Sequence, residues 1–393
     1  MKSKNLILYF VPFIVSGIIL YLSLDEDLWL NFWRFLNIPA QLPPFSDLES
    51  ISRALNGKID GFNPYYENPY DLKQKPYSYT SIWLTLFDVF KFDNIFNFRI
   101  FNFIIIYFYV FVFLKLIYQF NNKYFTTVVF ICFFSTSSFL VLERLNIELI
   151  IFILIYFISI TQVNLIRIPV FLLAIILKLY PIFSVFIFLR NKRLFITMVI
   201  SSLLVLFFLK DQIYLIMQNS IEYALIFVHG IPAIIKGIYY YSIKFNYFIN
   251  EENYYFFKLF FILLFSIYGL ILFLISFKFG EKKINNSLTL EESLFLCGGG
   301  IYIGRMIFFS NFDYGLIFLI FTIPYILKFG SYKLNIFYIL CLVISFNSIY
   351  LEGGDRYTFL YLFKSFFSHS LKIFIFSYIC FYFGKIVNNN LKV

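Results

Sequence analysis

Long apolar runs separated by short polar stretches are the main pattern of this chain. Most runs are long enough for bilayer-crossing helices and lack the ten-residue alternation of a membrane barrel. We therefore predict an all-α polytopic membrane protein of about 12 spans, with a long first outer loop and both termini inside. The predicted spans lie near residues 5–24, 100–120, 124–142, 147–162, 168–189, 194–209, 256–279, 294–309, 314–327, 334–350 and 371–386.

Each of two segments has two possible arrangements in the membrane. Residues 77–90 are short for a span, so they form either a span or an interfacial helix. Residues 168–189 form either one helix or a hairpin broken at Pro181. We favour the interfacial helix with the hairpin, because that combination brings Lys178 to the same outer face as Asp47.

Polar residues gather in two loops. The first follows the first span, and its part from Asp25 to Pro76 holds eight of the 22 acidic residues, namely Asp25, Glu26, Asp27, Asp47, Glu49, Asp60, Glu67 and Asp71. Basic clusters at 190–193, 278–283 and 328–333 are expected on the cytoplasmic side. We expect residues 1–393 to form one integral membrane domain, with 25–99 as the first extracytoplasmic loop, carrying interfacial helices, and 210–255 as the second.

Composition agrees with this assignment. Hydrophobic residues make up 61% and charged residues 14% of the chain, whereas a soluble domain has roughly a quarter charged residues. The net charge of +10 is explained by basic cytoplasmic loops, so no nucleic-acid partner is expected. The four cysteines lie in apolar runs without metal-ligand spacing, so neither disulfides nor a metal site nor a cofactor is expected.

Asp47 is the first candidate for chemistry. Transfer of a sugar to a hydroxyl requires a base within hydrogen-bond reach of the acceptor oxygen, and a carboxylate beside a membrane meets that need. The alternative is structural: Asp47 is a solvated acid of the loop, or Ser46-Asp47 caps a helix that begins with Leu48-Glu49-Ser50-Ile51.

Two polar sites interrupt the following spans. Glu143, Arg144, Asn146 and Glu148 fall at one helix junction, either as a binding site or as a solvated turn with an internal ion pair. Lys178 lies in an apolar run three residues before Pro181, where a cation suits a phosphate; otherwise it snorkels from a helix end.

The last candidates lie further along the chain. His229, in the second outer loop, could transfer a proton or bind a phosphate, or be structural. Arg305 is a cation at membrane depth close to Asn311 and Asp313, which fits either a substrate phosphate or a structural ion pair.

Together these motifs resemble the GT-C glycosyltransferases, specifically the polyprenyl-phosphate-mannose-dependent family 87 and its DUF2029 relatives. The resemblance covers roughly residues 1–330. It rests on the order of Asp47, Asn63-Pro64-Tyr65, Tyr77-Ser78-Tyr79 leading to Trp83, Glu143-Arg144-Leu145-Asn146, Lys178-Leu179-Tyr180-Pro181 and Asn311 to Tyr314. Two positions differ: Leu145 stands where relatives often have glycine, and Gly315 where they often have arginine.

The resemblance implies a GT-C-like bundle and an inverting hexosyltransferase. The donor would be a polyprenyl-phosphate sugar, with mannose the first candidate, and the acceptor a lipid or glycan. The active site would face the periplasm from a bacterial inner membrane. Asp47 would be the catalytic base, while Lys178, Arg144, Arg305 and His229 would bind the donor phosphate. Substrate contacts would come from Glu143, Asn146, Tyr65, Tyr66, Tyr180, Asn311 and Asp313.

Two other functions remain open from the sequence. A transporter or flippase for lipid-linked sugars would use the same lysine and arginine to hold a phosphate and would not need Asp47. A non-catalytic membrane subunit of an envelope assembly complex would need neither group.

Overall fold

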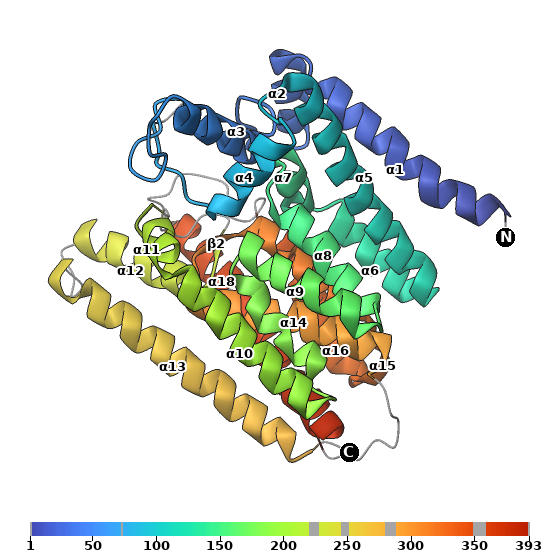
Figure 1. Ribbon diagram of the computed structural model, residues 1–393. Coiled ribbons are helices and arrows are strands. Elements are labelled where there is room, and N and C mark those ends of the chain that lie inside the picture. Colours follow the sequence, from blue (N-terminus) through green and yellow to red (C-terminus); the bar gives the residue numbers. More distant parts are fainter. Residues whose placement is uncertain are drawn as a thin grey trace. The chain divides into compact units, whose positions relative to one another are not determined.

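A computed structural model describes residues 2–71, 74–219, 228–244, 251–279, 288–348 and 359–391 (Figure 1). Apart from one two-stranded antiparallel sheet, its regular secondary structure is helical, which confirms the all-α prediction. Parts of the predicted polar segments, namely 220–227, 245–250, 280–287 and 349–358, lie outside the described residues.

The chain forms two compact units that alternate along the sequence. Unit 1 consists of Met1–Val129, Ser138–Leu179 and Ile200–Ile221, and unit 2 of Phe130–Ser137, Tyr180–Val199 and Glu222–Val393. Three helices have residues in both units: α6 (Lys123–Phe133), α7 (Thr136–Arg144) and α10 (Lys192–Phe208).

Unit 1 contains the first outer loop and the helices around it. The long helices α1 and α5 lie side by side (Figure 1), and α8 packs against both α5 and α9. The helices that lie wholly in this unit are α1 (Lys2–Leu22), α2 (Glu26–Phe35), α3 (Ser46–Ile59), α4 (Ser81–Val89), α5 (Ile95–Phe120), α8 (Glu148–Ile160), α9 (Asn164–Leu177) and α11 (Lys210–Asn219).

Unit 2 is built around a glycine-containing helix, α14. A Cβ on Gly298 would lie 2.3 Å from the Phe318 carbonyl oxygen, and one on Gly300 2.2 Å from that of Phe183. Small residues therefore let two 3-10 helices pack directly on α14. The elements are η1 (Tyr180–Phe188), β1 (Val228–His229), α12 (Ile231–Lys244), α13 (Glu251–Phe277), α14 (Leu290–Phe308), β2 (Asn311–Phe312), η2 (Asp313–Thr322), α15 (Ile323–Phe329), α16 (Tyr332–Phe346) and α18 (Phe359–Leu391).

The described helices do not support the predicted count of about 12 spans. By length and composition, three are able to cross a membrane: Ile95–Phe120, Asn253–Phe277 and Phe363–Asn390. The number rises to six if each bent helix pair is one span. Several apolar runs that the hydropathy pattern predicts as spans are instead short helices or 3-10 segments, such as η1 and η2.

The structure defines the conformation of the two segments for which the sequence allowed alternatives. Residues 77–90 contain only the nine-residue α4, which is too short to span a bilayer. Helix α9 ends at Leu177, and Lys178 is extended, with φ −157° and ψ 133°. The run 168–189 is therefore not one helix, and its break comes three residues before Pro181.

Candidate functional site

The Asp47 carboxylate lies in the first turn of α3 and meets the predicted helix junction. Its Oδ2 accepts a hydrogen bond of 2.5 Å from the side-chain amide of Asn146, 99 residues further along the chain. Asp47 is not the N-cap of α3, since that position is Phe45. The capping alternative is therefore wrong, and two residues proposed from the sequence lie in direct contact.

Residues with a strained backbone lie close to both partners of the Asp47–Asn146 hydrogen bond. Phe45, two residues before Asp47, has φ 63°, and Leu145, just before Asn146, has φ 45°. A left-handed conformation costs a non-glycine residue roughly 1–2 kcal/mol. It also explains why glycine suits position 145 in the resembling family. Such outliers gather at sites whose geometry is fixed by function.

Glu143 and Arg144 hold the segment that leads to Asp47. The Glu143 side chain is fully buried; its Oε1 accepts a 2.7 Å hydrogen bond from the Gln41 backbone N–H, and its Oε2 lies 2.8 Å from Arg144 Nε. Arg144 also donates to the Pro39 carbonyl at 3.0 Å. These contacts favour a supporting role for both residues rather than direct contact with substrate.

Lys178 is held beside this cluster by two sets of contacts. Its Nζ lies 2.8 Å from Glu148 Oε1, and the Glu148 side chain is only 1% exposed. The preceding carbonyl, that of Leu177, accepts a hydrogen bond of 3.0 Å from the Trp83 indole and one of 3.5 Å from the Thr80 hydroxyl. Helix α4 therefore fixes the end of α9 at the point where Lys178 leaves it.

Of the three carboxylates in this cluster, two form salt bridges and one does not. Glu143 pairs with Arg144 and Glu148 with Lys178, whereas Asp47 makes no salt bridge with any described residue. Burial raises the pKa of Asp47, and Arg144, the Asn146 amide and Lys178 oppose that rise. The result is a half-buried carboxylate that accepts an amide hydrogen bond and keeps lone pairs for a proton.

The aromatic side chains of the first outer loop differ in their exposure to solvent. Tyr66 is 68% exposed. Tyr65 is half-buried against Tyr77, its hydroxyl donates to the Tyr79 carbonyl at 2.9 Å, and burial raises its pKa to about 12. The Trp83 ring, which follows the Tyr77-Ser78-Tyr79 motif, is 2% exposed. Tyr66 alone of these three keeps a largely exposed ring.

The remaining predicted residues gather in unit 2. His229 Nδ1 lies 3.4 Å from Asp313 Oδ1, and both side chains are fully buried. The Arg305 guanidinium stacks 4.7 Å from the Tyr180 ring centroid. It also lies against Gly315, where a Cβ would be 1.9 Å from its Nη2.

Asn311 lies at the edge of this group, where its side-chain amide donates to the Arg305 carbonyl at 3.3 Å. Tyr180 is itself 3% exposed. Asn311, Asp313 and Tyr180 are thus in one neighbourhood with His229 and Arg305, whereas the sequence had placed only Asn311 and Asp313 close to Arg305. Their proposed contacts with substrate stay predictions.

Sequence reasoning missed Lys372 in this group. Its Nζ donates to Asp313 Oδ2 at 2.7 Å and to the Val228 carbonyl at 2.9 Å, and the side chain is fully buried. The signal was present, since Lys372 is one of two charges, with Lys385, in the apolar run of the last predicted span. The same signal had singled out Lys178.

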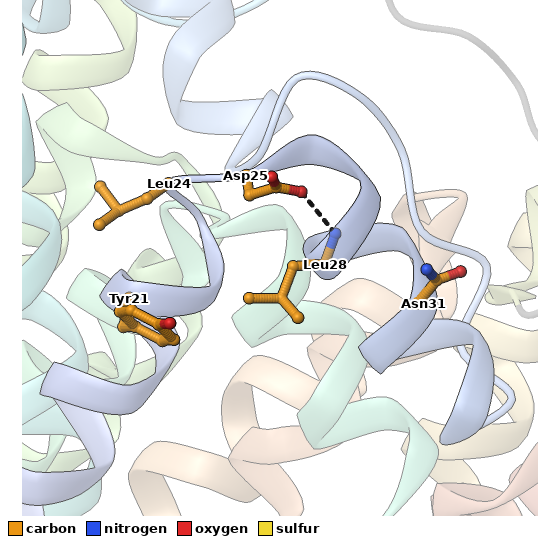
Figure 2. A pocket seen from close by; sticks show the side chains of 5 residues that line it. All are labelled: Tyr21, Leu24, Asp25, Leu28 and Asn31. Atoms are coloured by element: carbon orange, nitrogen blue, oxygen red, sulfur yellow. Dashed lines mark hydrogen bonds between the residues drawn. The ribbon is translucent and has the colours of Figure 1, made fainter.

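A hollow at the junction of α1 and α2 carries none of the predicted chemistry. It is lined by Tyr21, Leu24, Asp25, Leu28 and Asn31 (Figure 2). The Asp25 carboxylate accepts a 2.8 Å hydrogen bond from the Leu28 backbone N–H and so caps α2. The acid of this hollow therefore has a structural role.

Comparison of the chain with family models, with curated proteins and with solved structures gives no match. The resemblance to family 87 therefore stays a prediction that rests on the motifs and on the contacts described above.

Proposed function

We propose that this protein is an integral membrane glycosyltransferase with a GT-C-like helix bundle. It would move a hexose, with mannose the first candidate, from a polyprenyl-phosphate donor to a lipid or glycan acceptor. Asp47 is the general base in this proposal. We place the reaction on the periplasmic face of a bacterial inner membrane, where the resemblance puts it.

One observation carries the proposal. A half-buried carboxylate without a cation partner among the described residues lies between an amide donor and a lysine-containing cluster. A purely structural acid at such a position would be expected to pair with a cation, as Glu143 and Glu148 do. An unpaired carboxylate of raised pKa is the form that a general base requires.

The proposed reaction is a single displacement. Asp47 removes the proton from the acceptor hydroxyl as that oxygen forms a bond to the anomeric carbon. The bond between this carbon and the lipid phosphate oxygen breaks on the opposite face, so the configuration inverts. Lys178 stabilises the phosphate as it takes up negative charge, and Arg144 holds the segment that presents Asp47.

Charge balance sets one requirement on this mechanism. The cluster contains three carboxylates, on Asp47, Glu143 and Glu148, and two cations, on Arg144 and Lys178. A phosphate can bind Lys178 only if the ammonium exchanges its Glu148 partner for a phosphate oxygen. Lysine suits this exchange because its flexible ammonium acts as a point charge.

The test is release of polyprenyl phosphate from a panel of polyprenyl-phosphate hexoses by the purified protein in lipid. We expect Asp47→Asn to lower turnover about 100-fold or more, the usual effect of losing a general base. Glu49→Gln is the matched control, because this acid lies on the same helix but is paired with Arg53 at 2.8 Å. Full activity of Asp47→Asn would show that the base is misassigned.

A parent protein that binds these lipids and moves them across a vesicle membrane without cleavage would replace the proposal with the transporter.

A further inference from the structure

The polar residues of α18 form one buried stripe in unit 2. Tyr361, Ser365, Ser368, His369 and Lys372 follow spacings of four, three, one and three residues, which places them within about 100° of the helix circumference. All five are at most 5% exposed. The opposite side carries phenylalanines such as Phe363 and Phe366, which are 60% and 73% exposed. We call the five residues the α18 polar face.

Part of this face lacks hydrogen-bond partners. The two ring nitrogens of His369 form no hydrogen bond with a described residue, and neither does the Ser368 hydroxyl. A buried polar group left without a hydrogen bond destabilises the fold. Both side chains are at most 5% exposed, so bulk water does not meet these groups in the described conformation. Their positions therefore indicate an occupant that forms hydrogen bonds.

The face ends at an ion pair with a histidine beside it. Lys372 donates to Asp313 Oδ2, and the Ser348 hydroxyl donates to the same oxygen. The other carboxylate oxygen, Oδ1, faces His229 Nδ1 at 3.4 Å. The ring of Tyr302 stacks on His229 with centroids 6.1 Å apart.

These contacts favour one tautomer of His229. Two lone pairs facing each other would repel, so a hydrogen on Nδ1 suits the 3.4 Å approach to Asp313 Oδ1, although neither of these two atoms forms a hydrogen bond with a described residue. The lone pair is then on Nε2, which has no hydrogen-bond partner within the described ranges.

The charges exclude two classes of occupant. The Lys372 ammonium repels a metal cation, and no group of three His, Cys, Asp or Glu side chains able to hold a metal occurs in the part of the chain that the structure describes. The Asp313 carboxylate repels an anion. What remains is a neutral molecule that both donates and accepts hydrogen bonds, as water does. The imidazole of His229 is the group at this site that can accept a proton from hydrated surroundings.

We propose that unit 2 contains a hydrated proton-exchange site, in which water along the α18 polar face delivers a proton to Nε2 of His229 beside the Asp313–Lys372 pair. The proton leaves a hydronium ion, which becomes water, and bonds to the Nε2 lone pair. No other bond breaks, and release reverses the step. The site needs no glycosyl donor, so it stands or falls independently of the function proposed above.

The groups around His229 have opposite effects on its pKa. Burial lowers its pKa to about 4, Asp313 favours its protonated form, and Arg305 and Lys372 disfavour it. The imidazole is therefore neutral at pH 7 in the described conformation. Water that reaches Nε2 reduces the desolvation cost and raises the proton affinity of His229.

The composition of the chain makes this site directly measurable. The chain has only two histidines, so protein labelled with ¹⁵N-histidine gives ring-nitrogen signals from two imidazoles in solid-state NMR, one Nδ1 and one Nε2 signal each. The sample is the full chain in vesicles of phosphatidylethanolamine and phosphatidylglycerol, with His369→Gln to assign the signals. We expect magnetisation transfer from water to both rings, and protonation of His229 at Nε2 as the pH is lowered.

Two substitutions should move the titration in opposite directions. Asp313→Asn removes the carboxylate that stabilises the imidazolium and should lower the proton affinity of His229 about tenfold, whereas Lys372→Met should raise it by a similar factor. If either single variant does not fold, Asp313→Asn/Lys372→Met removes both charges together, and its midpoint should lie near that of the parent.

The proposal is overturned if water transfers no magnetisation to either imidazole of the parent, because the face is then dry. It is also overturned if His229 stays neutral throughout the pH range in which the protein is folded, if a single variant that folds leaves the midpoint of His229 unchanged, or if the double variant shifts it strongly.

Discussion

The Lys178–Glu148 ion pair provides a quantitative test of the cluster around Asp47. Glu148 is 1% and Lys178 23% exposed, and their charged atoms lie 2.8 Å apart. The substitution Lys178→Met would leave the Glu148 carboxylate buried without its cation. Breaking a buried pair in this way costs about 3–5 kcal/mol. Because Lys178 is partly hydrated, we expect the lower end, about 3 kcal/mol of unfolding free energy.

The matched control removes both charges. Lys178→Met/Glu148→Gln leaves no uncompensated ion, so its unfolding free energy should lie within about 1 kcal/mol of the parent. The two substitutions should therefore be coupled by about 2 kcal/mol or more. The assay is reversible unfolding of the purified protein in mixed micelles of increasing sodium dodecyl sulfate. A Lys178→Met protein as stable as the parent would refute the reasoning, because the pair would then contribute nothing.

The same variants separate stability from donor binding. The double variant should stay folded and lose affinity for polyprenyl phosphate, since the cation that receives the phosphate is absent. Glu148→Gln alone removes the carboxylate that competes for Lys178, so it should bind polyprenyl phosphate more tightly than the parent. If Glu148→Gln weakens binding as much as Lys178→Met does, the exchange of partners at Lys178 is wrong.

Two further predictions concern pH and backbone geometry. Because the pKa of Asp47 is raised, kcat/KM should fall as the pH drops through that raised value; Asn146→Ala removes a hydrogen bond to the carboxylate and should move this acid limb to higher pH. An unmoved limb in Asn146→Ala would separate it from Asp47. Gly230→Ala combines φ 112° with a Cβ 1.9 Å from the Phe309 carbonyl oxygen, whereas Gly61→Ala has φ 89° and no atom within 4 Å. The first should destabilise by about 3 kcal/mol or more and the second by about 1 kcal/mol, and equal losses in the micelle assay would contradict this account.

The sequence predicted the breaks in the chain better than the helices between them. Charged and amide side chains in apolar runs marked the junction before Glu148 and the end of α9 at Lys178, because such groups are costly in a bilayer unless the backbone brings them partners. Hydropathy alone did not show that residues 180–188 and 313–322 form 3-10 helices. Apolar composition reports burial, whereas continuity of an α-helix depends on local hydrogen bonds.

The candidate site was foreseen in part for the same reason. Residue type and order suggested that Asp47 and Asn146 belong together, and a hydrogen bond joins them. The supporting role of Glu143 was not predictable, since it depends on one bond to the Gln41 backbone, 102 residues away. The part played by Trp83 was likewise hidden, because an indole reads as an aromatic surface until its N–H partner is known.

The alternation of the two units along the chain has a consequence for biosynthesis. All of unit 1 is present once residue 221 has been made, whereas at that moment unit 2 has only Phe130–Ser137 and Tyr180–Val199. The latter segment includes η1, which packs on α14, and α14 begins at Leu290. The apolar surface of η1 must therefore be covered by lipid or by the insertion machinery until α14 is synthesised. A ribosome that pauses between residues 221 and 290 would leave a folded unit 1 attached to an exposed fragment of unit 2.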